Sequence, residues 1–206
     1  MSGMGHRSDD VTVGHPSIWV FGYGSLMWDP GFDYAERSWA RLEGWHRQFS
    51  IRSTRAWGTS AQPGLCLALH RGGTVSGMAY RLNDVGQVAA LAALDQRERA
   101  YRKISVSVSL PDSRSVSAIT YVYDPAHPRA QHGLTLAEQA SLIAMGRGEK
   151  GTSRYYLEST VAMLDDHGCA EPYLADLAGM IARYDCARSM SVKRSCDIDV
   201  CRSVER

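Results

Sequence analysis

The chain lacks the features that mark a membrane protein, a secreted protein or a nucleic-acid binder. No apolar run approaches the roughly 18 residues that a membrane-spanning helix requires. The first sixteen residues are polar and contain no apolar core, so no secretory signal is predicted. The 23 Lys and Arg residues nearly balance the 22 Asp and Glu residues, for a net charge of +1. This balance removes the usual electrostatic case for a nucleic-acid or membrane partner.

The sequence also lacks a disulfide or metal framework. Its 5 cysteines are scattered and form no Cys-x-x-Cys pair: Cys66, Cys169, Cys186, Cys196 and Cys201. We expect reduced thiols and a cytoplasmic protein, with Cys66 a small core residue. Cys196 and Cys201 leave open a disulfide or a metal pair. The histidines show no ligand spacing, so no metal is predicted.

What is present is enough apolar sequence for one folded domain. Hydrophobic residues make up 44% of the 206-residue chain and charged residues 22%, which favours a real core over disorder. We expect a domain over residues 17–188, a disordered segment over 1–16 and a flexible tail over 189–206. The fold class is α+β, since strand patterns fill the first two thirds and helical patterns fill the last third.

Alternation and turn residues define the expected elements. Strands are predicted over 17–21, 40–52, 64–70, 74–82, 104–110 and 116–123, with Gly72 and Gly73 as a two-residue hairpin turn. A helix is predicted from a cap at Asn83 or Asp84 to about Glu98, with an inner face of Val85, Val88, Leu91, Ala92 and Leu94. Three later helices are predicted over about 135–145, 152–167 and 171–188, the first opened by a capping box of Thr135 and Glu138.

The turn over residues 20–26 reads Val-Phe-Gly-Tyr-Gly-Ser-Leu and follows an apolar strand. Its two glycines, Gly22 and Gly24, let a ligand approach the main chain closely. Consecutive N–H groups in such a turn can hold a carboxylate or a developing oxyanion. The pattern fails as a dinucleotide-binding fingerprint and as a Gly-x-Ser-x-Gly nucleophile motif. An ordinary turn at the end of a strand stays open as an alternative.

A second candidate is the acidic pair near the end of the first predicted helix. Glu98 follows Asp95 by three residues, so both lie on one helical face. Basic residues surround them. The pair is either a solvated charge cluster or an acid–base centre that works with the glycine turn.

Read together, these segments resemble one family. The run over residues 20–28 closely resembles the opening motif of the ChaC-type γ-glutamylcyclotransferases. The similarity continues in order through residues 53–64, 77–81, 94–102 and 151–157, and spans roughly 17–185. The resemblance implies a small mixed β-barrel with flanking α-helices. It also implies a lyase that closes the γ-glutamyl group of glutathione into 5-oxoproline and releases Cys-Gly, with glutathione as a small-molecule partner and no cofactor.

The resemblance also implies roles for individual residues. Glu98 matches the family's catalytic glutamate. The positions implied to bind substrate are Phe21, Gly22, Tyr23, Gly24, Ser25, Leu26, Ser53, Tyr101 and Tyr156.

The chemistry implied by the resemblance needs a base and a bent substrate. The substrate's α-amine must attack its own γ-carbonyl, yet near pH 7 it is mostly an ammonium, with a reference pKa of about 8. A glutamate with an ordinary pKa of about 4.3 is a weak base, and partial burial would raise that pKa toward the working range. The same carboxyl can then protonate the leaving nitrogen, and a fixed bent conformation supplies effective molarity.

The chain departs from the family pattern at five positions. Arg99 and Ala100 replace two glycines, Ala56 and Trp57 replace a His-Arg pair, and Ser153 aligns with an Asn. We expect these positions to read the distal end of the substrate. Three alternatives follow: a cyclotransferase for other γ-glutamyl amino acids or amines, a non-catalytic γ-glutamyl-binding module, and a serine hydrolase that uses Ser25.

Overall fold

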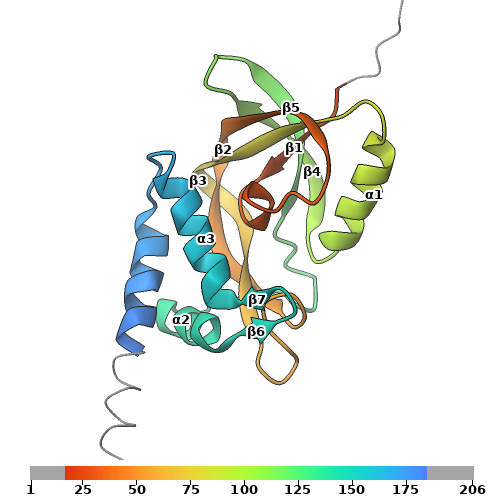
Figure 1. The fold of residues 1–206 in the computed structure, drawn as a ribbon. Helices are drawn as coiled ribbons and strands as arrows, with labels where there is room; N and C mark the ends of the chain where they lie inside the picture. The colour runs from red at the N-terminus through yellow and green to blue at the C-terminus, as the bar shows by residue number, and fades with distance from the viewer. Residues whose placement is uncertain (1–16, 185–206) are drawn as a thin grey trace, which may run out of the picture.

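Five strands close into a barrel in the computed structural model, which describes residues 17–184 (Figure 1). The order around the barrel is β1–β3–β2–β4–β5. The bounds are β1 Trp19–Gly22, β2 Tyr34–Ser53, β3 Gly64–Leu82, β4 Arg102–Ser109 and β5 Ser115–Val122. All neighbouring strands are antiparallel except β1 and β5, which are parallel and close the barrel. The segments predicted to be disordered, 1–16 and 189–206, lie outside the described residues.

The predicted hairpin turn at Gly72 and Gly73 is wrong. β3 runs through both glycines without a break and pairs along its length with β2. Both glycines have positive φ, 101° and 75°, and Gly44 opposite them has φ 77° beside a register shift. The glycines therefore form a bulge that bends two long strands together around the barrel. The loop that joins β2 to β3 is the polar segment over 54–63.

Helix α1, Gln87–Arg97, begins later than predicted and buries fewer of its apolar side chains. Its N-cap is Gly86, in the left-handed conformation, and no side chain caps it. Leu94 is buried, whereas Val85 and Val88 are 93% and 77% exposed. The predicted inner face is thus wrong at both valines and at Ala92, which is exposed as well, because the helix packs on the barrel through Leu94, near its C-terminal end. That end is where Glu98 lies, as the C-cap residue.

The remaining helices cover the opposite side of the barrel from α1 (Figure 1). They are α2 Leu136–Met145, α3 Ser153–Asp165 and a helix over 172–184. The predicted capping box is present, since Thr135 and Glu138 bond each other's backbone N–H groups at the start of α2. A two-stranded ribbon, β6 Arg147–Gly148 and β7 Gly151–Thr152, joins α2 to α3.

The main core lies between the barrel and these three helices. Leu157 and Leu164 of α3, and Leu174 and Leu177 of the last helix, are at most 1% exposed and belong to one cluster with barrel side chains such as Phe49. Each Å² of apolar surface removed from water contributes about 25 cal/mol. The burial of these side chains is therefore the main force that holds the helices against the barrel. The predicted α+β class and mixed barrel with flanking helices are confirmed.

Candidate active site

A cavity of about 430 Å³ opens where the end of α1, the segment over 54–63 and the β6–β7 turn meet the barrel. Its volume is in the range of small-molecule sites. It brings together most of the residues predicted to act on a substrate: Tyr23, Gly24, Ser25, Leu26, Ser53, Glu98, Tyr101 and Tyr156. Segments far apart in the sequence thus converge on one hollow.

Phe21 and Gly22, by contrast, do not line the cavity. Phe21 is fully buried in the barrel core. A Cβ on Gly22 would lie 2.6 Å from the Cβ of Leu26, so this glycine lets the turn fold back on itself. Neither residue therefore has a place in the cavity wall, and a role for them in substrate binding stays a prediction.

Glu98 lies in the cavity wall at the end of α1. Its N–H bonds the carbonyl of Leu94 at 2.8 Å and its carbonyl accepts from Tyr101 N–H at 2.9 Å, which fixes the backbone between α1 and β4. The side chain is only 14% exposed. Burial raises the pKa of its carboxyl, and the nearby positive charges of Arg97, Lys150 and Arg129 oppose that rise. The result is a carboxyl suited to proton transfer.

Asp95 does not line the cavity. Its carboxylate accepts from Lys103 Nζ at 2.9 Å and from the hydroxyl of Tyr121, which is a lining residue, at 2.8 Å. These hydrogen bonds hold its pKa below the usual value. Of the two acidic residues on this helical face, Asp95 is therefore the solvated one and Glu98 the buried one.

Arg97 ties Glu98 to the glycine turn. Its Nε lies 3.2 Å from Glu98 Oε1, and its Nη2 donates to Ser25 Oγ at 2.9 Å. Its Nη1 donates to the carbonyl oxygens of Asp29 and Pro30 at 2.8 and 3.1 Å. One guanidinium thus links the carboxyl in the cavity wall to both ends of the segment over 25–30. We call this contact set, centred on Arg97, the arginine clasp.

Tyrosine hydroxyls fill the floor of the cavity. Tyr23 donates to the Tyr121 carbonyl at 2.6 Å and Tyr101 donates to the Leu67 carbonyl at 3.0 Å. The Tyr156 hydroxyl accepts from the backbone of Ser25. Burial raises the pKa of Tyr23, Tyr101 and Tyr156 well above the usual value, so all three stay neutral. The floor is polar but carries no charge of its own.

Replacing Gly24 with alanine should distort this floor. A Cβ at Gly24 would lie 2.2 Å from the Tyr156 hydroxyl oxygen and 3.3 Å from its Cζ. We expect the Gly24→Ala variant to lose about 1–3 kcal/mol of stability through overpacking, along with most of its ligand binding. The double variant Gly24→Ala/Tyr156→Phe removes the clashing oxygen and should recover much of the lost stability. Thermal unfolding of both variants and of Tyr156→Phe alone checks this; a double variant no better than Gly24→Ala would contradict it.

Of the residues at which the chain departs from the family pattern, Trp57, Arg99 and Ala100 line the cavity and Ser153 does not. Ser153 is fully buried, and its hydroxyl donates to the Leu65 carbonyl at 2.7 Å while it accepts from Leu65 N–H at 3.0 Å. Ser153 therefore joins α3 to β3. The interpretation that it reads the distal end of the substrate is wrong.

Sequence reasoning missed several lining residues. Cys66 faces the cavity as well as the core, and burial raises the pKa of its thiol to about 12, so it is an inert thiol. Basic residues were also missed: Arg52, Arg55, Arg97, Arg129 and Lys150. Arg52 and Arg55 lie close to Ser53 in the sequence, but nothing in the sequence indicated that Arg129 would join them.

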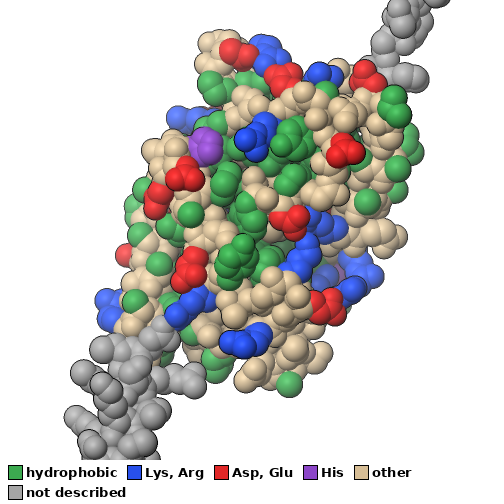
Figure 2. All heavy atoms as spheres, in the orientation of Figure 1, with side chains coloured by type: hydrophobic (Ala, Val, Ile, Leu, Met, Phe, Trp, Pro, Cys, Tyr) green, Lys and Arg blue, Asp and Glu red, His purple; other side chains and the backbone are tan. Residues whose placement is uncertain are grey.

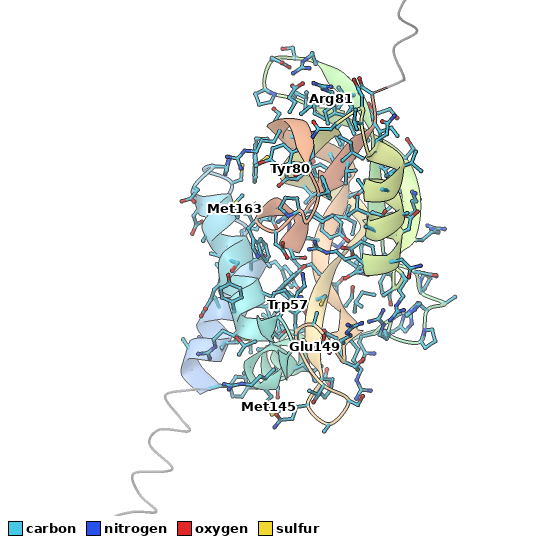
Figure 3. All side chains as sticks on the ribbon, turned by 45° about the vertical axis from the view of Figure 1, so that its right-hand side comes forward. Trp57, Tyr80, Arg81, Met145, Glu149 and Met163 are labelled. Carbon is cyan, nitrogen blue, oxygen red and sulfur yellow. The ribbon has the colours of Figure 1, made fainter. Side chains whose placement is uncertain are left out.

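Basic side chains gather at the mouth of the cavity. Figure 2 shows Lys and Arg side chains clustered between the lower end of α1 and the β6–β7 turn. In Figure 3, Trp57 and Glu149 lie near each other where α3 begins, and both line the cavity. Among the described residues, the lining includes six Arg and Lys side chains against the acidic pair Glu98 and Glu149, and it contains no histidine. The mouth suits an anionic ligand.

Three further findings concern the described residues as a whole. Within residues 17–184, no group of three or more His, Cys, Asp or Glu side chains is placed to hold a metal ion. No helix of the same residues has the length and apolarity to cross a membrane. Cys66 and Cys169, the described cysteines, are free thiols.

Comparison with known proteins places this geometry in context. A family profile described as "ChaC-like protein" matches residues 18–184. The chain is 39% identical over 163 residues to the glutathione-specific γ-glutamylcyclotransferase of Escherichia coli K12, covering 78% of this chain and 71% of that protein. It is 28% identical over 176 residues to γ-glutamylcyclotransferase 2-3 of Arabidopsis thaliana, covering 80% and 88%.

The fold has a solved counterpart. A crystal structure described as a γ-glutamyl cyclotransferase specific to glutathione from yeast superposes with a TM-score of 0.75 at 22% identity. The match covers 82% of this chain and 96% of that one. At this level of sequence identity, the superposition is evidence for a shared fold alone.

Proposed function

This chain belongs to the ChaC-like protein family, and from that premise we propose that it is a γ-glutamylcyclotransferase that converts glutathione to 5-oxoproline and Cys-Gly. The observation that carries the proposal is the buried Glu98 carboxyl in the wall of a substrate-sized cavity, opposite the glycine turn. The residues around it supply what an intramolecular acyl transfer requires. We take residues 17–188 as the catalytic domain.

In the proposed reaction, Glu98 carries protons from the attacking nitrogen to the leaving nitrogen. It accepts a proton from the substrate's α-ammonium, and the freed amine attacks the γ-carbonyl to form the five-membered ring. The attacking nitrogen then gives up a second proton, the bond from the carbonyl carbon to the leaving nitrogen breaks, and this nitrogen takes up both protons and departs as the ammonium of Cys-Gly. No water is consumed and no oxidation occurs, so these groups suffice without a cofactor.

The glycine turn and the tyrosines would hold the γ-glutamyl group bent. In this proposal, backbone N–H groups of the turn over residues 23–26, other than that of Ser25, bind the α-carboxylate or the tetrahedral oxyanion. The neutral hydroxyls of Tyr23, Tyr101 and Tyr156 give the cavity floor fixed dipoles. A substrate fixed in this way reacts within a preformed geometry, which is the main source of acceleration in ring closure.

Two alternatives receive less support from this site. A serine hydrolase would need a histidine beside Ser25, and Ser25 Oγ instead accepts from Arg97. A binding module without activity would gain nothing from burying a carboxylate, which costs free energy. We also propose a cytoplasmic setting, in line with the free thiols of Cys66 and Cys169.

The direct test is product formation. The purified protein is incubated with reduced glutathione, and 5-oxoproline and Cys-Gly are followed by mass spectrometry. We expect both products in equal amounts. Activity only on other γ-glutamyl compounds would keep the reaction and change the substrate. Silence across a panel of γ-glutamyl amino acids and amines would overturn the proposal in favour of the binding module.

A further inference from the structure

Two arginines lie side by side at the mouth of the cavity. Ile51, near the end of β2, forms an antiparallel bridge with Ala130. The next residue, Arg52, donates its N–H to the Arg129 carbonyl at 2.8 Å. Residues directly opposite each other in an antiparallel pair project from the same face. The side chains of Arg52 and Arg129 therefore leave the backbone together, and both line the cavity.

This arginine pair has no acidic partner among the described residues. No carboxylate of residues 17–184 lies within 4.0 Å of either guanidinium, whereas three other basic side chains of the cavity are in ion pairs: Arg55 with Glu149, Lys150 with Asp29 and Arg97 with Glu98. Like charges opposite each other in a strand pair are destabilising. An anion between the two guanidinium groups would relieve that repulsion.

The backbone that carries Arg129 is well held. Besides the bond from Arg52, its own N–H donates to His127 Nδ1 at 3.1 Å, and the segment is fixed again where Tyr123 OH donates to the Gln131 carbonyl at 2.9 Å. The side chain is half-buried. A charge on a held backbone, with no carboxylate paired to it among the described residues, is preorganised for an anionic ligand.

We propose that Arg52 and Arg129 form the binding site for the terminal carboxylate of the peptide that leaves the γ-glutamyl group. This inference rests on the proposed function. Guanidinium groups bind carboxylates through paired, charge-assisted hydrogen bonds. In glutathione that carboxylate belongs to glycine.

The position of the pair fits the far end of the substrate. Arg52 and Arg129 lie where the end of β2 pairs with the segment around residue 130, whereas Glu98 lies on another part of the cavity wall, at the end of α1. In an extended dipeptide the terminal carboxylate lies roughly 7 Å beyond the scissile amide, at about 3.5 Å per residue. The pair would thus make binding depend on the length and the charge of the leaving group. It would also disfavour γ-glutamyl amines, which leave both charges without a counter-ion.

The test compares glutathione with its glycine ethyl ester, in which the terminal carboxylate is capped by an ethyl group and carries no charge. We expect wild type to release 5-oxoproline from glutathione with a kcat/KM about 10- to 100-fold higher than from the ester, the range for hydrogen bonds to charged groups. Arg129→Gln should bring the two values close together, mainly through a raised KM for glutathione. Arg129→Lys, which keeps the charge, should retain part of the preference.

Arg55→Gln is the matched control. Arg55 also lines the cavity, but it lies outside the pair and its charge is already paired with Glu149, so its removal should leave the preference for glutathione over the ester in place. An equal loss of preference in Arg55→Gln and Arg129→Gln would overturn the assignment, since the carboxylate would then be attracted by the positive potential of the whole mouth. Equal cleavage of glutathione and ester by wild type would overturn it as well.

A binding measurement separates this inference from the proposed function. Titration calorimetry of the Glu98→Gln variant with glutathione and with the ester reports the carboxylate preference without turnover. Preferential binding of glutathione that disappears in Glu98→Gln/Arg129→Gln would support the site even if wild type released no product. Equal binding of both ligands by Glu98→Gln would overturn the site even if wild type were active.

Discussion

Replacing Glu98 with glutamine is expected to lower kcat for 5-oxoproline release by about 10²- to 10⁴-fold, the range that general acid–base catalysis supplies. Glutamine keeps the size of the side chain and can still contact the arginine clasp. It cannot accept a proton from the α-ammonium, so the amine would stay unreactive. Ligand binding should be largely kept, because the turn, the tyrosines and the basic mouth are untouched. Steady-state kinetics together with calorimetry on glutathione measures both quantities.

Asp95→Asn provides the matched control for this experiment. It removes a carboxylate from the same helix, three residues earlier, with contacts only to Lys103 and Tyr121. We expect a change in kcat below about threefold, since surface ion pairs contribute roughly 0–1 kcal/mol. Substantial turnover by Glu98→Gln would contradict the role of Glu98. An equally large loss in Asp95→Asn would indicate that both substitutions act by disturbing the structure of α1, and not by removing a proton acceptor.

The site could be predicted from the sequence where a residue's role follows from local chemistry. The glycine turn and Glu98 stand at the ends of regular elements, and such ends can be found from strand alternation and from the helix pattern. The distinction between Asp95 and Glu98 could not be predicted in this way. Both are carboxylates on one helical face, and only the barrel decides that Glu98 is 14% exposed while Asp95 reaches solvent.

The errors in the fold have a common physical origin. Gly72-Gly73 predicts a hairpin from local conformational preference alone, yet the positive φ values there serve a bulge, because the paired strand carries Gly44 opposite. Val85 and Val88 predict a buried helix face, yet the chain packs only the later part of α1 on the barrel. Tertiary pairing overrides local preference in both cases.

Arg129 illustrates the limit of sequence reasoning for the site. It lies in an irregular segment, 77 positions from Arg52 in the chain by the difference of their numbers, and nothing local marks it. The bridge between Ile51 and Ala130 alone brings the two arginines together. Long-range strand pairing of this kind leaves no periodic signal in a single sequence.

Removing the arginine clasp should change the pH dependence of the enzyme as well as its rate. In the Arg97→Gln variant we expect kcat/KM to fall roughly 10- to 100-fold, since hydrogen bonds to charged groups contribute about 1.5–3 kcal/mol. The variant loses the contact with Glu98 and the bonds to Ser25, Asp29 and Pro30. The carboxyl and the turn that faces it would then no longer be held in one geometry.

The sign of the pH effect follows from the groups around Glu98. Burial raises the pKa of this carboxyl, and the positive charges of Arg97, Lys150 and Arg129 oppose the rise, Arg97 most strongly. The base must be ionised to accept a proton, so kcat/KM falls as the pH drops through that pKa. Without Arg97 the pKa rises further, and the acidic limb of the pH–rate profile should move to higher pH. The other groups that face Glu98 stay neutral across this range: Tyr23, Tyr101, Tyr121, Tyr156 and Cys66.

Arg97→Lys distinguishes the charge of the clasp from its shape. Lysine keeps a positive charge beside Glu98 but cannot donate to Ser25, Asp29 and Pro30 at once, because it presents a point charge instead of a planar fork. We expect its acidic limb to stay close to that of wild type while kcat/KM still falls. An acidic limb that is the same in wild type, Arg97→Lys and Arg97→Gln would mean that Arg97 acts only on the fold of the segment over 25–30. A limb that moves in Arg97→Gln alone would mean that the same side chain both positions the base and keeps it ionised.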